Sequence, residues 1–543
     1  MFARLIPLVA LLVVAVAYLF SAQQDEPRPP YIQGRNRTAL FLANEEHGLA
    51  NVFIATAFAM LENHPDIQVH YASWDSARQR VHRAASFARE ANPAAQNIIF
   101  HTLTSMSYRD AVEAQGKNFT NIIHAPASAG IAHISRDIQT YLCPWEPAQH
   151  LELYDEVGAL LDAVDPAVVV VDSIFRPAID ATRDRHRQHA ILTPNTHVDN
   201  FPAIQPYGGM FWKYPAMSSG FSFPIPWHQI PENIYLNARF IYSIMAGSFI
   251  RRKQAVLRQH GLQDPIDFMH LHRPDVPWIT MHTEGAAIPV DVVPANVTSA
   301  GPILVHSATA AQQDPELVAW MQRAPTVLIN LGSSVQYDDQ RARAFAQAIA
   351  DVLARSDVQV LWKFRTWGAM SDDYLDALAP HVLGDRVRLP TWLAADPYAL
   401  LASGHVSVFV HHGGSGCYHE GISSGVPQLV LPLWADLYSF AALAETLGVG
   451  SWGCRQTSPE WTSECLSESL LRVIANEKMR EKASALGEKV RARGNGRDIA
   501  AKEIAKLALT AHKFPTPVTN RRPAQPLGRP YDLLANSLSL VGD

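Results

Sequence analysis

Short apolar runs alternate with segments of helical period along most of the chain. The run from Ala39 to Ala43 predicts a buried strand, and the apolar positions between Val52 and Leu61 recur at helical spacing. The run from Ala167 to Val171 is continuously apolar, which is typical of a strand covered on both faces. This alternation predicts an α/β fold with a doubly wound parallel sheet, in which ligands bind outside the carboxyl ends of the strands.

A glycine-rich segment carries the most specific local pattern. The apolar run from Val406 to Val410 stops at His411-His412-Gly413-Gly414-Ser415-Gly416, and the pattern then becomes helical. Glycines let an anion approach the backbone, and the N–H groups at a helix N-terminus favour phosphate. Glu420 lies on that helix and Asp436 follows the next strand, where carboxylates can accept hydrogen bonds from sugar hydroxyls. The segment therefore predicts a phosphate site with sugar-binding carboxylates beside it.

The order and spacing of these residues resemble the donor signature of the UDP-glycosyltransferase family. The matching positions are His412-Gly413-Gly414, Glu420, Gly425, Pro427, Pro432 and Asp436. The resemblance implies a GT-B fold: α/β, with two Rossmann-like doubly wound domains and a cleft between them. It implies that the second domain holds the UDP-sugar and the first holds the acceptor. It also implies that Gly332 and Ser333 touch the diphosphate and that Trp392 stacks on uracil.

The chain departs from the family pattern on the sugar side. Ala394 and Ala395 replace the Pro and Gln that usually follow the tryptophan, Gly416 replaces an Asn, and Leu437 replaces the Gln of an Asp-Gln pair. Asp436 can still accept hydrogen bonds from sugar hydroxyls, whereas Leu437 cannot make amide contacts. The identity of the transferred sugar therefore stays open.

Two residues at predicted strand ends in the first half of the chain suggest a general base. His47 lies in the loop after the first strand, and Asp172 directly follows Val171. If the two loops meet, Asp172 can orient the imidazole and leave its other nitrogen free to accept a proton. The family similarly carries its base histidine after the first strand, often with an aspartate partner after a later strand. Glu45 and Glu46 are rivals that fit solvated loop charges better.

The predicted reaction follows from these parts. His47 deprotonates an acceptor hydroxyl, which attacks the anomeric carbon from the face opposite UDP and inverts its configuration. His412, the Ser415-Gly416 backbone and Ser333 stabilise the departing diphosphate. We expect no cofactor and no metal, because no Asp-x-Asp pair is placed to hold one and the His and Cys spacings do not suggest zinc. The predicted UDP-sugar site comprises Gly332, Ser333, Trp392, His412, Gly414, Ser415, Gly416, Glu420 and Asp436.

Charge and composition indicate the class of partner. The net charge is -6 and the chain has no basic block, which argues against nucleic acid. The segment 202–242 is crowded with aromatic residues and prolines, and the corresponding region of the family builds the acceptor side. We therefore predict transfer of a hexose from a UDP-sugar, UDP-glucose foremost, to a hydroxyl of a small lipophilic acceptor such as a secondary metabolite, sterol or other lipid. The alternative is a catalytically silent UDP-sugar-binding or partner protein, because the donor motif departs from the family pattern.

The ends of the chain carry the remaining predictions. Arg4 precedes an apolar run from Leu5 to Phe20, which favours an uncleaved anchor over a cleaved signal peptide. Residues 1–24 are thus expected to anchor a single-pass membrane protein of the endoplasmic reticulum with a luminal catalytic domain. Sequons begin at Asn36, Asn118 and Asn296 and would be reachable for glycosylation there. We expect the acceptor domain at 35–306, the UDP-sugar domain at 314–512 and a tail at 513–543.

Overall fold

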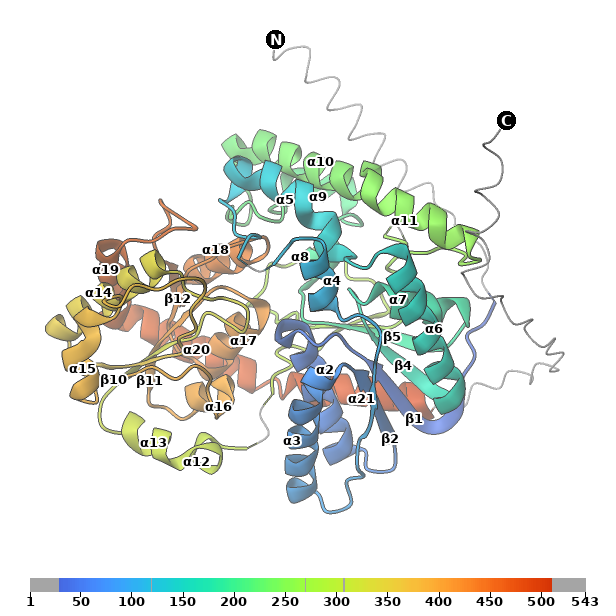
Figure 1. Ribbon diagram of the computed structural model, residues 1–543, viewed down its shortest axis with the longest axis horizontal. Helices are drawn as coiled ribbons and strands as arrows, with labels where there is room; N and C mark the ends of the chain where they lie inside the picture. The colour runs from blue at the N-terminus through green and yellow to red at the C-terminus, as the bar shows by residue number, and fades with distance from the viewer. Residues whose placement is uncertain (1–28, 119, 269, 306–307, 510–543) are drawn as a thin grey trace, which may run out of the picture. The chain divides into compact units, whose positions relative to one another are not determined.

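Two parallel β-sheets organise the residues that the computed structural model describes, namely 29–118, 120–268, 270–305 and 308–509 (Figure 1). The first sheet has the strand order β3-β2-β1-β4-β5-β6-β7, and the second has the order β10-β9-β8-β11-β12-β13. In each sheet the order reverses next to the first strand, which is the topology of doubly wound nucleotide-binding folds. The predicted α/β architecture with two parallel sheets is confirmed.

The strands of the first sheet bring two predicted site residues to one edge. Leu42 of β1 pairs with Ala72 of β2 on one side and with Val171 of β4 on the other, so the chain leaves β1 and β4 at the same carboxyl edge. Ala39 and Phe41 point into one core and Leu40 and Leu42 into another, because alternate side chains face opposite sides of a strand. The strands are β1 (Arg35–Leu42), β2 (Gln68–Ser73), β3 (Ile99–Thr102), β4 (Pro166–Asp172), β5 (His189–Thr193), β6 (Trp278–Thr280) and β7 (Val297–Ser299).

Helices connect these strands and pack on the first sheet. The long ones are α2 (His47–Asn63), α3 (Asp75–Ala91), α5 (Ala127–Leu142), α6 (Pro147–Val164), α10 (Ile230–Ala246) and α11 (Ser248–Gln259). The shorter ones are α4 (Tyr108–Ala114), α7 (Arg176–Asp184), α8 (His197–Asn200), α9 (Gly209–Trp212) and the 3-10 turns η1 (Pro206–Gly208) and η2 (Trp227–Gln229).

The second sheet repeats this plan with shorter strands. Its strands are β8 (Thr326–Ile329), β9 (Gln359–Trp362), β10 (Val387–Arg388), β11 (Val406–His411), β12 (Gln428–Val430) and β13 (Gly450–Trp452). Its helices are α12 (Ala310–Gln313), α13 (Pro315–Met321), α14 (Asp339–Arg355), the 3-10 turn η3 (Asp376–Leu378), α15 (Ala379–Leu383), α16 (Pro397–Ala402), α17 (Ser415–Ser424), α18 (Leu437–Leu447), α19 (Ser463–Ile474) and α20 (Glu477–Arg491). A disulfide joins Cys454, which follows β13, to Cys465 of α19.

The last described helix returns to the first sheet. α21 (Gly496–Leu509) places Ala501, Ile504 and Ala508 in the same core as Phe41 of β1 and Phe53 of α2 (Figure 1). The two sheets lie within the predicted ranges 35–306 and 314–512, whose exact boundaries stay a prediction.

The predicted location in the membrane is corrected. Among the described residues, no helix is long and apolar enough to cross a bilayer. The anchor predicted at 1–24 and the tail at 513–543 lie outside the described residues. At one of the three sequons, the nitrogen that would carry a glycan already makes hydrogen bonds. The Asn296 side-chain nitrogen donates to the carbonyl oxygens of Arg273 and Val276, at 2.9 and 2.5 Å.

Candidate functional site

The glycine-rich turn after β11 forms the N-terminus of α17, as the sequence predicted. Gly413 has φ +92°, and a Cβ there would lie 2.8 Å from the Leu437 carbonyl oxygen, so only glycine fits. The first hydrogen bond of the helix runs from the Tyr418 N–H to the Gly414 oxygen, 2.9 Å. The N–H groups of the residues between them therefore have no partner within the helix. A Cβ on Gly416 would meet open space, so an anion can reach this end of the helix.

Two glycines fix the ring of His412 at the end of β11. A Cβ on either Gly332 or Gly414 would lie 2.6 Å from the His412 Cε1 atom, so the imidazole fits only between two residues without side chains. Burial first, and then His411 and Lys363, lower the pKa of His412 to about 3. Its Nδ1 atom is buried without a hydrogen-bond partner. The ring is therefore neutral and can offer one N–H to an anion placed at α17.

Lys363 is a site residue that the sequence analysis missed. It directly follows β9, and its Nζ donates to the Gly332 carbonyl oxygen at 2.8 Å and lies 3.8 Å from the centre of the Trp392 ring. Burial first lowers the pKa of Lys363 to about 8, with Glu420 acting in the opposite direction. A charged side chain after an apolar strand was the available signal. Lys363 thus joins the predicted diphosphate contact to the predicted uracil platform.

Ser333 and Ser415 make hydrogen bonds that connect their loops to neighbouring elements. The Ser333 carbonyl oxygen accepts a hydrogen bond from Arg365 Nη1 at 2.8 Å. The Ser415 hydroxyl donates to the carbonyl oxygen of Pro194, 2.6 Å away, and is buried. Since Pro194 belongs to the first half of the chain, Ser415 ties the N-terminus of α17 to the loop after β5.

The two predicted sugar-binding carboxyl groups have raised pKa values. Burial and the neighbouring charge of Asp396 raise the pKa of Glu420 to about 8, against the lowering effect of Lys363. Burial and the charge of Asp199 raise the pKa of Asp436 to about 7. Asp436 immediately precedes α18 but its side chain caps no N–H of that helix. Carboxyl groups whose pKa is raised in this way are concentrated at functional sites.

His47 lies against the second half of the chain. It is the first residue of α2, and its ring centre is 5.1 Å from that of Trp392, whose side chain is 47% exposed. Burial first, and then Arg80, Lys363 and further arginines, lower the pKa of His47 to about 3. The imidazole is neutral at assay pH and can accept a proton. The base predicted in the first half thus contacts the tryptophan predicted to hold the uracil.

The predicted hydrogen bond between His47 and Asp172 is absent among the described residues. Asp172 accepts instead from the Asn44 side-chain amide at 3.0 Å and from the Ile174 N–H at 2.9 Å. Asn44 lies in the loop after β1, three residues before His47, and its side chain contacts Asp172 at the end of β4. Burial raises the pKa of Asp172 to about 6, with these hydrogen bonds opposing the change. Asp172 therefore holds the loop that leads to His47 rather than the imidazole itself.

The loop of Glu45 and Glu46, which were expected to be solvated charges, contacts two arginines. Glu46 is buried and accepts two hydrogen bonds from Arg109, at 2.9 and 3.0 Å, so it is an ion-paired group rather than a solvated one. The Glu45 carbonyl oxygen accepts from Arg80 at 2.6 Å. These pairs place two arginines near His47.

A hollow of about 500 Å³ lies elsewhere, at the amino ends of β8 and β11. Its lining includes Arg323, Val406 and Arg480 and none of the predicted site residues. Ligands of doubly wound sheets bind at the opposite, carboxyl edge.

Comparison with known proteins agrees with this geometry. Residues 242–491 match the family model described as UDP-glucoronosyl and UDP-glucosyl transferase. Glycosyltransferase sdnJ of Sordaria araneosa is 33% identical over 443 residues, which cover 78% of this chain and 85% of that protein. The chain belongs to this family. It is a UDP-dependent glycosyltransferase, as the resemblance in the donor motif implied.

Two further comparisons extend the likeness of this glycosyltransferase. Human 2-hydroxyacylsphingosine 1-beta-galactosyltransferase is 26% identical over 261 residues, covering 47% of this chain and 43% of that protein. A UDP-glucosyltransferase from Polygonum tinctorium, capable of glucosylating indoxyl and solved with 3,4-dichloroaniline, superposes with a TM-score of 0.56 at 16% identity. That match covers 89% of this chain and all of the other, and it shows that the two-sheet GT-B fold is shared.

Proposed function

We propose that this glycosyltransferase moves a hexose from UDP-glucose to a hydroxyl group of a small lipophilic acceptor, with inversion at the anomeric carbon. The observation that carries the proposal is the contact between His47 and Trp392, 5.1 Å between ring centres. One residue is the candidate base of the first half, and the other is the candidate uracil platform of the second. Their contact supports a single site in which an acceptor hydroxyl meets a UDP-linked sugar.

The proposed step uses groups that face this contact. His47 takes the proton of the acceptor hydroxyl, the oxygen bonds to the anomeric carbon, and the bond from that carbon to the diphosphate oxygen breaks. UDP leaves with the electron pair. His412, Lys363 and the free N–H groups of α17 neutralise the charge that develops on the diphosphate. These donors make the proposed reaction independent of a metal or cofactor.

Donor binding also explains how a histidine with so low a pKa can act as a base. Burial first, and then the charges of Arg80, Lys363, Arg109 and Arg365, disfavour the imidazolium form of His47. The negative charge of a bound diphosphate offsets the contribution of these cations, so the pKa of His47 rises when the donor binds, while burial still holds it below its ordinary value. Donor binding therefore makes the imidazole a stronger base.

Two relatives and the aromatic segment of this chain support the proposed acceptor class. The human relative is named for an acylsphingosine and the Polygonum enzyme for glucosylating indoxyl, and both are lipophilic compounds. The aromatic segment of this chain is partly buried, with Phe211 and Tyr214 inside and Tyr207 and Trp227 exposed. We propose that the buried part of this segment borders the acceptor.

Transfer by His47→Ala tests the proposal. The purified full chain is assayed with UDP-glucose, UDP-galactose and UDP-glucuronic acid against a panel of hydroxylated aromatic and lipid acceptors. We expect His47→Ala to lose at least about 100-fold in kcat, the contribution of a general base, while the Kd for UDP stays unchanged. His82→Ala, an exposed histidine on α3, is the matched control.

Two results would contradict this proposal. Equal transfer by His47→Ala and the wild type would remove the proposed base. UDP binding without transfer from any donor of the panel would favour the silent binding protein instead.

A further inference from the structure

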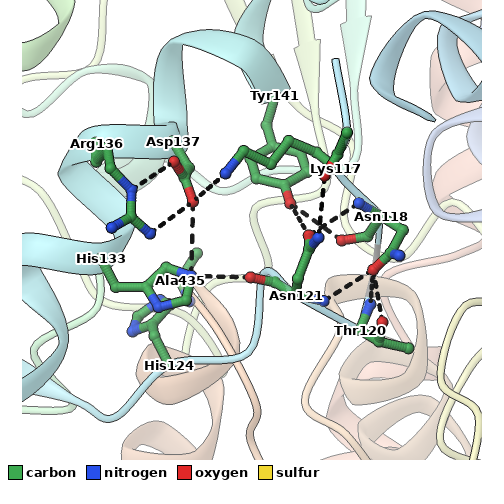
Figure 2. A network of polar contacts seen from close by, with 11 residues as sticks. Lys117, Asn118, Thr120, Asn121, His124, His133, Arg136, Asp137, Tyr141 and Ala435 are labelled. Carbon is green, nitrogen blue, oxygen red and sulfur yellow. Dashed lines mark hydrogen bonds and ion pairs between the residues drawn. The ribbon is translucent and has the colours of Figure 1, made fainter. Parts of the chain in front are cut away.

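A histidine of the first half holds the turn that precedes Asp436 in the second half. His124 lies in the loop between α4 and α5, and it makes three hydrogen bonds to the segment 433–438. Its N–H donates to the Leu433 carbonyl oxygen at 3.1 Å, and the Ala435 N–H donates to its Nε2 at 2.9 Å. The Tyr438 hydroxyl donates to the His124 carbonyl oxygen. Figure 2 shows His124 beside Ala435, at the edge of a larger polar network.

The protonation of the His124 ring follows from its other neighbour. Nδ1 lies 2.7 Å from the Ala125 carbonyl oxygen, which can only accept, so Nδ1 carries the hydrogen and Nε2 keeps its lone pair for Ala435. Burial lowers the pKa of His124 to about 4, so this neutral form persists at assay pH. Gly130 makes the arrangement possible, because a Cβ there would lie 1.8 Å from the Ala125 oxygen.

The loop that carries His124 is itself well supported. His133 of α5 lies 2.8 Å from the Asn121 carbonyl oxygen, and the Tyr141 hydroxyl donates to the Asn118 carbonyl oxygen at 3.0 Å (Figure 2). Lys117 pairs with Asp137 at 3.0 Å. These contacts with α5 hold the segment just before His124 in place. His124 therefore has a fixed position against the second half of the chain.

The turn held by His124 has an unusual backbone. Ala435 has φ +41°, the left-handed region that residues with a Cβ seldom adopt. Its N–H is the one that His124 accepts. On one side Trp434 places its ring 5.9 Å from that of His412, and on the other Asp436 begins the approach to α18. Without an acceptor for the Ala435 N–H, the turn can relax to negative φ and rotate the peptide that carries Asp436.

We propose that His124 is a positioning residue for the donor sugar: through Ala435 it sets the direction of the Asp436 carboxyl group, which the proposed function places against the sugar hydroxyls. The inference rests on that proposed role of Asp436. It makes the acceptor half of the chain a determinant of donor-sugar recognition, although His124 itself touches no substrate.

Two substitutions of His124 by amide side chains of different length test this inference. In His124→Asn the amide takes the place of Nδ1 and is too short to reach Ala435, whereas in His124→Gln the side-chain oxygen can take the place of Nε2. We expect His124→Asn to raise the KM for UDP-glucose about tenfold, the effect of one buried hydrogen bond, with a smaller change in kcat. His124→Gln should restore KM to within about threefold, because it supplies an acceptor again. The Kd for UDP alone, which lacks the sugar, should be unchanged in both.

Controls separate positioning from general damage. His82→Gln alters an exposed imidazole of α3, away from the His124 loop, and it should leave KM unchanged. Tyr438→Phe removes another of the three contacts and should raise KM in the same direction, which keeps the test open if His124→Asn does not fold. Equal KM values for the Asn and Gln variants, or a parallel loss of UDP affinity, would overturn the inference.

Asp436→Asn separates failure of this inference from failure of the proposed function. If Asp436→Asn leaves the KM for UDP-glucose unchanged, the proposed sugar contact is wrong and the inference falls with it. If Asp436→Asn raises KM and His124→Asn does not, only the inference is wrong. If both raise KM and the double variant is no worse than Asp436→Asn alone, the two residues act as one unit, as we propose.

Discussion

At the scale of single residues, the candidate site keeps charges that the donor-free protein does not compensate. Asp436 faces Asp199 across the two halves of the chain, and Glu420 faces Asp396. Two carboxylates so close cost free energy when both are ionised, and partial burial increases that cost. A ligand that donates hydroxyl hydrogens would relieve the cost. The same groups therefore link the pH dependence of stability to the proposed site.

Asp436→Asn should stabilise the donor-free enzyme more at high pH than at low pH. The pKa of Asp436 is about 7 in the folded chain, whereas the ordinary value is 3.8, so the folded chain binds the proton more tightly than the unfolded chain does. Stability is lost as the pH rises from about 4 through 7 and the buried carboxyl group ionises. The amide cannot ionise, so its advantage over the wild type grows across this window and is constant above it.

Thermal unfolding at several pH values measures this advantage. We expect Asp436→Asn to raise Tm by on the order of 3 °C at pH 8 and by less at pH 5. Asp436→Ser is a less suitable comparison because it also removes volume. A Tm difference that is independent of pH would show that Asp436 is not a buried ionising group.

At the scale of elements, the loop between β1 and α2 determines where the candidate base lies. Asn44 joins this loop to the end of β4 through Asp172, and His47 follows as the first residue of α2. Because Asp172 bonds Asn44 and not His47, its influence on the imidazole is indirect. The two possible roles of Asp172, holding the loop or orienting the base directly, predict different effects of substitutions on kcat.

Asn44→Ala should mimic Asp172→Ala if the aspartate acts through the loop. We expect each variant to lower kcat roughly tenfold, the consequence of one broken buried hydrogen bond, and the double variant to be no worse than Asp172→Ala. His47→Ala should be much more severe. Steady-state transfer rates with saturating UDP-glucose measure the series. A direct dyad would instead give Asp172→Ala an effect close to that of His47→Ala and leave Asn44→Ala near the wild type.

The same elements show what sequence reasoning could reach. The ends of β1, β4 and β11 were predictable because each apolar run and the polar residues or glycines after it are encoded within a few residues. Lys363 directly follows the apolar strand β9, just as Asp172 follows an apolar run, so the same local pattern marks both residues. The partners of Asn44 and His124 lie 128 and 311 residues away in sequence, and no local pattern encodes such distances. For that reason the sequence did not reveal that Asp172 bonds Asn44.

At the scale of the whole molecule, the helix α21, which follows the second sheet in sequence, packs in the core of the first sheet. α21 packs Ala500, Ile504 and Ala505 against the first sheet, and its Leu507 carbonyl oxygen accepts a hydrogen bond from Gln188 at 2.9 Å. Ser415 and His124 make further bonds between the halves. The stability of the first sheet therefore depends on residues that follow the UDP-sugar site in sequence.

Ile504→Ala should weaken the first sheet although the residue belongs to the C-terminal part of the described chain. Its side chain is fully buried, so the cavity should cost about 2–5 kcal/mol of unfolding free energy. We expect faster hydrogen exchange in β1 and α2, which share its core, and unchanged exchange in β8 and β11, which do not. Lys502→Ala, exposed on the same helix, is the control and should leave both sheets unaffected. Faster exchange confined to α21 itself would mean that this helix covers the first sheet without stabilising it, and the first half would then hold its base loop in place without help from the C-terminal segment.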